Sequence, residues 1–288
     1  MEVIVAKFAG MCGGVKHTVD MANKILDENK QKTIYCLGKL VHNENVVKKL
    51  ENKGMKIVEN INEVPNNSIV IFRAHGVTKD NYEIANEKNL KVYDLTCENV
   101  KKIQRKVINN KQKYIIIIGK KDHAESVATK SFADTNSVIL ENEEEIKMAI
   151  QKVIDSKINK VYIVAQTTYS SLKFNEISEK LKERLNSIGI ETEIDKTICM
   201  ATEIRQKEAD ELSKKADSVI VIGGKNSSNT KKLYDIALNN CKNVYFIESA
   251  KELNIDEIKN KNYKKILILA GASTPSEDIK EVKEKLEI

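Results

Sequence analysis

YIIIIGKKDHAE, residues 114–125, shows the pattern from which the fold class follows: an apolar run, a polar turn and the start of a helical segment. A run of five apolar residues leads directly into a short polar turn, and a segment with apolar residues at helical spacing comes after the turn. A continuous β-branched run, unlike an alternating one, is typical of a strand covered on both faces, as in parallel sheets. The stretch therefore predicts a buried parallel strand, a turn at its carboxyl end and a helix.

The same pattern recurs along the chain of 288 residues. Short β-branched runs alternate with longer Lys- and Glu-rich segments whose apolar residues have helical spacing, which indicates repeated βαβ units. The expected strands are Val3–Ala6, Thr33–Leu37, Ile69–Phe72, Lys91–Asp94, Tyr114–Ile118, Val161–Ala165, Glu191–Ile194, Ser218–Ile222, Val244–Ile247 and Lys265–Leu269. The clearest expected helices are Val15–Glu28, Val100–Asn109, Leu172–Asn186 and Met200–Lys215. The predicted class is α/β.

Unusual residues gather at the turns that follow the expected strands, where open parallel sheets bind their ligands. They form three sets in chain order: Cys12, His42 and His75; Cys97, His123 and Thr167–Thr168; Cys199, Ser227–Asn229 and Ser273. Each third of the chain thus opens with a strand, a cysteine and a helix. We expect three similar α/β domains, residues 1–96, 97–196 and 197–288, with small mostly parallel sheets. Their cysteines are expected to converge on a pseudo-threefold axis.

Composition and charge exclude several classes of protein. Lys and Arg number 48 against 42 Asp and Glu, a net charge of +6, but the lysines are interleaved with acidic residues as on solvated helix faces. With no basic and aromatic platform, nucleic acid is not an expected partner. The longest apolar runs are far shorter than the roughly 18 residues of a membrane span. The N-terminus has no signal-peptide pattern, so we expect a cytoplasmic protein.

Five cysteines without a C-x-x-C motif argue against a disulfide scaffold, a zinc ribbon and a thioredoxin motif. Cys12, Cys97 and Cys199 each precede a predicted helix, whose N-terminus favours thiolate. Three converging thiolates would repel one another without a cation, so they indicate a metal or a cluster. A [4Fe–4S] cluster with only three cysteines keeps one iron open; zinc and scattered free cysteines are the alternatives. Cys36 and Cys241 receive no role.

The other turn residues suit an anionic ligand. The histidines can donate hydrogen bonds to a phosphate or hydroxyl group, and the short polar residues at helix N-termini suit a phosphate or diphosphate, although capping alone would also explain them. No P-loop and no strand-anchored G-x-G-x-x-G is present, which disfavours NTP and NAD. Glu125 is a candidate general acid, with a solvated glutamate at a helix start as the alternative.

Five segments in this order carry a resemblance to a known family: Arg73–Val77, Gln166–Thr168, Thr197–Gln206, Asn226–Asn229 and Ala270–Pro275. Together with the three cysteines they resemble the LytB-type 4-hydroxy-3-methylbut-2-enyl diphosphate reductases, over essentially the whole chain. The chain departs from the family pattern in the residues around Cys12 and in residues 119–122. Glu98 and Ala124 also stand where prolines are usual.

The resemblance implies an iron–sulfur oxidoreductase. Cys12, Cys97 and Cys199 would hold a [4Fe–4S] cluster with one open iron, and Glu125 would handle protons, with Thr168 as a relay. The residues implied in substrate binding are His42, His75, His123, Thr167, Thr168, Ser227, Ser228, Asn229 and Ser273.

The implied reaction is reductive dehydroxylation of 4-hydroxy-3-methylbut-2-enyl diphosphate to isopentenyl and dimethylallyl diphosphate, the last step of the methylerythritol phosphate route. Ferredoxin or flavodoxin would supply electrons, and we expect a monomer. The alternatives are an iron–sulfur dehydratase of another phosphorylated hydroxy compound and a non-enzymatic, metal-containing module that binds diphosphate or senses redox state.

Overall fold

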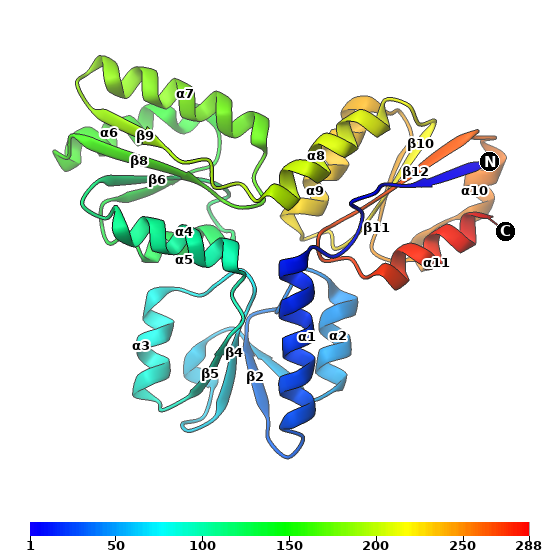
Figure 1. The fold of residues 1–288 in the computed structure, drawn as a ribbon, viewed down its shortest axis with the longest axis horizontal. Coiled ribbons are helices and arrows are strands. Elements are labelled where there is room, and N and C mark those ends of the chain that lie inside the picture. The colour runs from blue at the N-terminus through cyan, green and yellow to red at the C-terminus, as the bar shows by residue number, and fades with distance from the viewer. Residues whose placement is uncertain (288) are drawn as a thin grey trace. The chain divides into compact units, whose positions relative to one another are not determined.

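The computed structural model describes residues 1–287 and contains three sheets of four parallel strands each (Figure 1). The first sheet has the spatial order β3 (Met55–Val58), β2 (Ile34–Leu37), β4 (Ile69–Phe72), β5 (Lys91–Asp94). The second has the order β7 (Ser137–Leu140), β6 (Tyr114–Ile118), β8 (Lys160–Ala165), β9 (Glu191–Ile194). The third has the order β11 (Val244–Ile247), β10 (Ser218–Ile222), β12 (Lys265–Ala270), β1 (Glu2–Val5).

The helices connect these strands. Their bounds are α1 Gly13–Glu28, α2 Glu44–Asn52, α3 Lys79–Glu87, α4 Glu98–Asn109, α5 Ala124–Ser131, α6 Ile146–Ser156, α7 Ser171–Ser187, α8 Met200–Ser213, α9 Ser228–Asn240, α10 Ile255–Asn260 and α11 Ser276–Glu287. The chain divides into two compact units. The first unit comprises Met1–Val19, Val41–Leu50 and the chain from Met200 onward, and it contains the third sheet. The second unit comprises Asp20–Leu40 and Glu51–Cys199, with the other two sheets.

All ten expected strands are present, with ends that differ by no more than one residue. Two strands were missed, β3 and β7. Both are four residues long and lie at the edge of a sheet. The α/β class and the parallel sheets predicted from the continuous apolar runs are confirmed.

The strand order is the same in all three sheets, and the N-terminal strand β1 belongs to the third sheet. In the first two sheets the four strands, numbered along the chain, lie in the spatial order second, first, third, fourth. The third sheet keeps this order only if β1 counts as its fourth strand, because Val3 pairs with Ile266 and Val5 with Ile268. The expected assignment of Val3–Ala6 to the N-terminal domain is therefore wrong: this strand completes the C-terminal sheet. The boundaries at residues 97 and 197 remain predictions.

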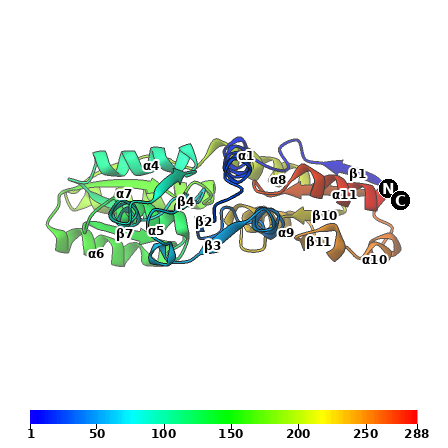
Figure 2. The same ribbon diagram turned by 90° about the horizontal axis from the view of Figure 1, so that it is seen from below.

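Helices cover both faces of the second sheet, which explains its continuous apolar strands. In β6, Ile116 and Ile118 pack with α6 and α7, through residues such as Val153 and Phe174. The alternate residues Ile115 and Ile117 pack with α4 and with Phe132 and Ala133, which directly follow α5. Figure 2 shows α4 and α6 on opposite sides of this sheet. Neither face of the strand can be polar, so the sequence does not alternate.

The third sheet is built in the same way. Ile220 and Ile222 of β10 pack towards α10 and α11, in a cluster that includes Val282. Val219 and Val221 pack on the opposite face with residues of α8 and α9. The apolar strands thus fix the sheets, and the turns at their carboxyl ends stay free for polar residues.

The two positions where the family usually has proline are each the first residue of a helix. Glu98 begins α4 and Ala124 begins α5. Proline is favoured at this position because it needs no hydrogen-bond donor there. Glutamate is also favourable in a first turn through the helix dipole, and alanine has the highest helix propensity. The two replacements therefore keep the helix starts.

Among residues 1–287, no helix is both long enough and apolar enough to cross a membrane.

Replacing Ile116 by alanine should destabilise the second sheet strongly, because this fully buried side chain lies in the middle of β6. A loss of about 2–5 kcal/mol in the free energy of unfolding is expected from such a cavity. The control is Ile154→Ala on α6, where the side chain is 47% exposed and the loss should stay below about 1 kcal/mol. Urea unfolding of both variants checks this, and equal losses would contradict the described core.

Candidate active site

Each of the three turn cysteines is fixed by the same backbone hydrogen bond. The N–H of Cys97 donates to the carbonyl oxygen of Ala74 at 2.9 Å, and the N–H of Cys199 donates to that of Thr167 at 3.0 Å. In the other unit, the N–H of Cys12 donates to the carbonyl oxygen of Ala272 at 3.1 Å. Every acceptor is the second residue after the third strand of its sheet.

This repeated bond links each cysteine to a turn that carries a candidate ligand-binding residue. The residues directly after the three acceptors are His75, Thr168 and Ser273. Each cysteine also stands at the start of a helix, before α4, α8 and α1 respectively. The strand–cysteine–helix pattern read from the sequence is thus a repeated structural element.

The sulfurs of these three cysteines differ from the other two in their surroundings. Cys12, Cys97 and Cys199 are partly exposed, whereas Cys36 and Cys241 are buried. Burial raises the pKa of the Cys36 thiol to about 12, which keeps it protonated. Cys241 donates its S–H towards backbone carbonyls, the nearest at 3.5 Å. Only the three turn cysteines therefore have surroundings suited to a thiolate ligand.

The carboxyl group of Glu125 is buried and held by a single residue, Thr167. The Thr167 N–H donates to Oε1 at 2.5 Å and the Thr167 hydroxyl donates to Oε2 at 2.6 Å. Glu125 is 2% exposed, and burial raises its pKa to about 7, although the two hydrogen bonds act in the opposite direction. Glu125 can therefore hold or release a proton near neutral pH, as a general acid must.

Thr167 also connects this acid to Cys199. Its carbonyl oxygen accepts the Cys199 N–H, while its N–H and hydroxyl bind Glu125. Within residues 1–287, Glu125 accepts its hydroxyl hydrogen bond from Thr167 and not from Thr168. The hydroxyl oxygen of Thr168 accepts a hydrogen bond from the Gln166 side-chain amide at 2.7 Å. A single turn after β8 thus holds the acid, a candidate metal ligand and a second hydroxyl.

Two histidines expected from the sequence lie side by side in the second unit. The rings of His75 and His123 meet edge to face, with centroids 5.6 Å apart. His123 is also the N-cap of α5, because its Nδ1 accepts the Glu125 N–H at 3.2 Å. Since Nδ1 accepts, a neutral His123 carries its proton on Nε2 and can donate it to an anion. His75, His123 and Glu125 therefore form one polar group with the Thr167 turn.

The remaining expected residues lie in the first unit. The Ser273 hydroxyl donates to the backbone carbonyl of His42 at 3.2 Å. Ser227 is the N-cap of α9, which is the capping role given above as the alternative to ligand binding. Ser228 is the first residue of that helix. Asn229 is 3% exposed, and neither atom of its amide has a hydrogen-bond partner in the described chain. A buried amide of this kind is costly unless a ligand satisfies it.

A glycine after the first strand of each sheet was not singled out in the sequence as part of the site. Gly38, Gly119 and Gly223 each donate their N–H to the last residue of the neighbouring edge strand. Gly38 has a φ of +71°, and a Cβ there would collide with the guanidinium of Arg73. Arg73 Nε in turn donates to the carbonyl oxygen of Gly76 at 3.4 Å, across the turn that carries His75. The spacing of the three glycines, each four residues before His42, His123 or Ser227, is the signal that could have found them.

The donor chemistry of the three turn cysteines fits an iron–sulfur cluster. In residues 1–287, no three or more His, Cys, Asp or Glu side chains come together as ligands of one ion. In a cluster each cysteine binds a different iron. Three partly exposed cysteines at helix starts supply the soft donors that iron–sulfur clusters need. Cys12 belongs to one unit and Cys97 and Cys199 to the other, so their convergence stays a prediction.

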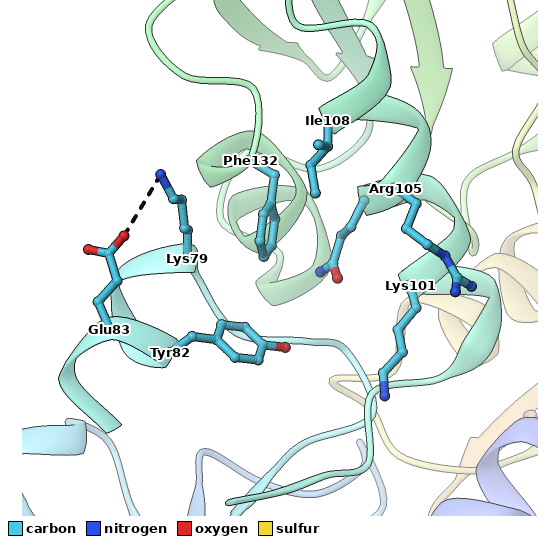
Figure 3. Close-up of a pocket in the computed structure, with 8 residues that line it drawn as sticks. Lys79, Tyr82, Glu83, Lys101, Arg105, Ile108 and Phe132 are labelled. Atoms are coloured by element: carbon cyan, nitrogen blue, oxygen red, sulfur yellow. Dashed lines mark ion pairs between the residues drawn. The ribbon is translucent and has the colours of Figure 1, made fainter. Parts of the chain in front are cut away.

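A separate pocket of about 380 Å³ lies in the second unit, between α3, α4 and α5 (Figure 3). Tyr82, Gln104 and Phe132 line it, and its rim carries Lys79, paired with Glu83 at 3.8 Å. None of the residues expected to bind substrate or metal lines this pocket. It is therefore distinct from the group around Glu125.

Comparisons with known proteins agree on one family. Residues 3–287 match the model of the family described as LytB protein. A relative from Caldanaerobacter subterraneus subsp. tengcongensis is 38% identical over 99% of this chain and 96% of its own length. A relative from Clostridioides difficile is 39% identical over 98% of both chains. Both relatives carry the name 4-hydroxy-3-methylbut-2-enyl diphosphate reductase.

Solved structures give the same result. The E-1-hydroxy-2-methyl-but-2-enyl-4-diphosphate reductase from Plasmodium falciparum has a TM-score of 0.88 and 32% identity, covering 100% of this chain and 88% of its own. A second structure, described as (E)-4-hydroxy-3-methyl-but-2-enyl diphosphate reductase, the terminal enzyme of the non-mevalonate pathway, has a TM-score of 0.70 and 33% identity over 99% of both chains.

Gly38→Ala should disturb the turn that carries His75, because the added Cβ displaces the Arg73 side chain. Gly54→Ala is the matched control: its φ is +100°, but a Cβ there would have no neighbour within 4 Å. Both variants should lose about 1–2 kcal/mol through the unfavourable φ, and Gly38→Ala should lose more. Urea unfolding and the NMR resonances of His75 check this; an unchanged His75 resonance in Gly38→Ala would contradict it.

Glu125 should make the stability of the protein depend on pH between about 4.5 and 7. Its pKa is higher in the folded state than in the unfolded state, so the folded state binds more protons in this window and stability falls as pH rises. The free energy of unfolding of the wild type, relative to Glu125→Gln, should fall by about 3 kcal/mol across the window and stay level above it. Because both proteins contain the same histidines, the contribution of histidine titration cancels in this difference. If the free energies of unfolding of the two proteins changed in parallel with pH, the raised pKa of Glu125 would be refuted.

Proposed function

The chain belongs to the LytB family, and from this premise we propose that it catalyses the reductive dehydroxylation of 4-hydroxy-3-methylbut-2-enyl diphosphate to isopentenyl and dimethylallyl diphosphate. The observation that carries the proposal is the position of Thr167, which binds the buried acid Glu125 with its N–H and hydroxyl and the N–H of Cys199 with its carbonyl. A proton source and a candidate metal ligand are thus held by one residue. Reduction of a C–O bond with loss of water needs both.

We assign Cys12, Cys97 and Cys199 as ligands of a [4Fe–4S] cluster, on the basis of their donor chemistry and of the family. Such a cluster with one iron free of protein ligands supplies single electrons and a position that polarises the substrate hydroxyl. The electrons would come from a cytoplasmic one-electron donor such as ferredoxin or flavodoxin.

Glu125 supplies the proton that turns the leaving hydroxyl into water. Replacing C–O by C–H takes two electrons and two protons and releases one water molecule. With a pKa of about 7, Glu125 is protonated in a large fraction of molecules at neutral pH. When protonated, its carboxyl O–H can donate to the Thr167 hydroxyl oxygen 2.6 Å away, which frees the Thr167 hydrogen to turn towards the substrate. Thr168, whose oxygen accepts from Gln166, keeps its own hydrogen for a second relay.

Neutral hydrogen-bond donors and helix N-termini would hold the diphosphate. His123 donates through Nε2 because Nδ1 is occupied by the Glu125 N–H, and His75 lies against its ring. The unpartnered amide of Asn229 and the start of α9, with Ser227 and Ser228, suit phosphate oxygens. We assign His42 and Ser273, which are joined by a hydrogen bond, to the same substrate. These donors fix the orientation of the allylic chain.

The test is anaerobic turnover of 4-hydroxy-3-methylbut-2-enyl diphosphate with a chemically reduced one-electron dye. The wild type should form both products only when the dye is present. A dehydratase would turn over without any reductant, and a non-enzymatic module would show no turnover with it. Glu125→Gln should lower the rate by at least about 100-fold, the usual contribution of general acid catalysis. The exposed control Glu144→Gln should keep the rate.

Iron content tests the ligand assignment separately. Cys97→Ser should lose iron, whereas Cys241→Ser should keep it, because that thiol only donates to backbone carbonyls and a serine hydroxyl can do the same. Equal iron content in the two variants would remove Cys97 from the ligands.

A further inference from the structure

The side chain of Asn99 reaches the sulfur of Cys199. The amide nitrogen of Asn99 lies 3.0 Å from Sγ, although the two residues are 100 positions apart in the chain. Asn99 is the second residue of α4, and Cys97 is the N-cap of the same helix. One helix turn therefore carries one proposed cluster ligand and contacts the sulfur of another. All three residues lie in the second unit.

This contact differs in kind from the one at Cys12. The Cys12 sulfur faces the backbone N–H of Val15 at 3.5 Å, a donor that any helix start would supply. Cys199 instead accepts from a side chain, at a shorter distance. A thiolate can only accept hydrogen bonds, so the amide nitrogen of Asn99, and not its oxygen, must face it.

The backbone on each side of the Asn99–Cys199 hydrogen bond is fixed by other hydrogen bonds. On one side, the Cys97 N–H is bonded to Ala74, and the next turn of α4 closes with the Lys101 N–H on the Cys97 carbonyl at 3.0 Å. Val100, beside Asn99, is buried and anchors the helix. On the other side, the Cys199 N–H is bonded to Thr167. The backbone on both sides of the contact is thus fixed before any cluster binds, while the Asn99 side chain itself lies exposed at the start of α4.

A donor at this position changes the electrostatics of the sulfur. The positive end of the N–H dipole points at Sγ, so it stabilises negative charge there. Reduction of an iron–sulfur cluster adds an electron whose charge is shared with the thiolate ligands, and hydrogen bonds to sulfur are one of the factors that set the reduction potential. The donor therefore stabilises the reduced form more than the oxidised form.

We propose that Asn99 is a positioning residue that raises the reduction potential of the cluster through its hydrogen bond to Cys199. The proposal rests on the proposed function, because Cys199 must be a cluster ligand. It assigns to Asn99 the role of matching the cluster to its electron donor, a role separate from proton delivery by Glu125.

The experiment is a redox titration of the anaerobically purified, cluster-loaded protein, followed by the EPR signal of the reduced cluster. Asn99→Leu removes the donor, and Asn99→Asp, nearly isosteric, replaces it with a negative charge. The control Asn109→Leu makes the same change at an exposed position at the far end of α4. Iron is counted in every sample.

The midpoint potential should shift to more negative values in Asn99→Leu and further in Asn99→Asp, while Asn109→Leu should match the wild type. Unchanged potentials in both Asn99 variants, with full iron content, would overturn the proposal. Loss of iron from both would also overturn it, because Asn99 would then hold the cluster and not set its potential. A wild-type protein without iron would instead refute the proposed function, and this inference with it.

Discussion

The hydrogen bond from each cysteine N–H to the turn after a third strand is the contact on which the candidate site depends. It occurs three times, at Cys12, Cys97 and Cys199, with donor–acceptor distances of 2.9–3.1 Å. Parallel strands make it possible, because their carboxyl ends lie at one edge of a sheet, so the turn after the third strand lies beside the segment that follows the fourth. The bond fixes a soft metal ligand next to a polar turn in every third of the molecule, and each turn then adds its own chemistry: a histidine, a threonine pair or a serine.

Around Thr167 this arrangement combines opposite electrostatic demands. Glu125 must be buried enough to keep its proton near pH 7, yet it must stay in contact with a hydroxyl that can pass the proton on. Cys199, whose N–H is bonded to the Thr167 carbonyl oxygen, is instead partly exposed and faces the amide of Asn99. Thr167 thus lies between a desolvated, buried acid and a partly exposed sulfur that accepts a hydrogen bond. A buried acid with a strongly raised pKa is typical of a functional site.

The sequence predicted ten of the twelve strands and most of the polar turn residues, but not the contacts between distant segments. Continuous apolar runs such as Tyr114–Ile118 predicted the buried strands correctly because burial on both faces leaves no other choice. The pairing of β1 with β12 could not be read from residues 2–5, since register depends on a partner more than 260 positions away. The Asn99–Cys199 contact and the packing of Arg73 on Gly38 are equally non-local. The raised pKa of Glu125 depends on its burial, which an isolated glutamate at a helix start does not reveal.

The central claim is that three cysteines hold a four-iron cluster and leave one iron open to the substrate. Mössbauer spectroscopy of the anaerobically purified, iron-57-labelled protein tests this most directly, because it resolves irons with different ligands. The account predicts one iron site distinct from the other three, and addition of the allylic diphosphate should change the signal of that site. Four equivalent irons, or no cluster signal in a folded and active protein, would contradict the account.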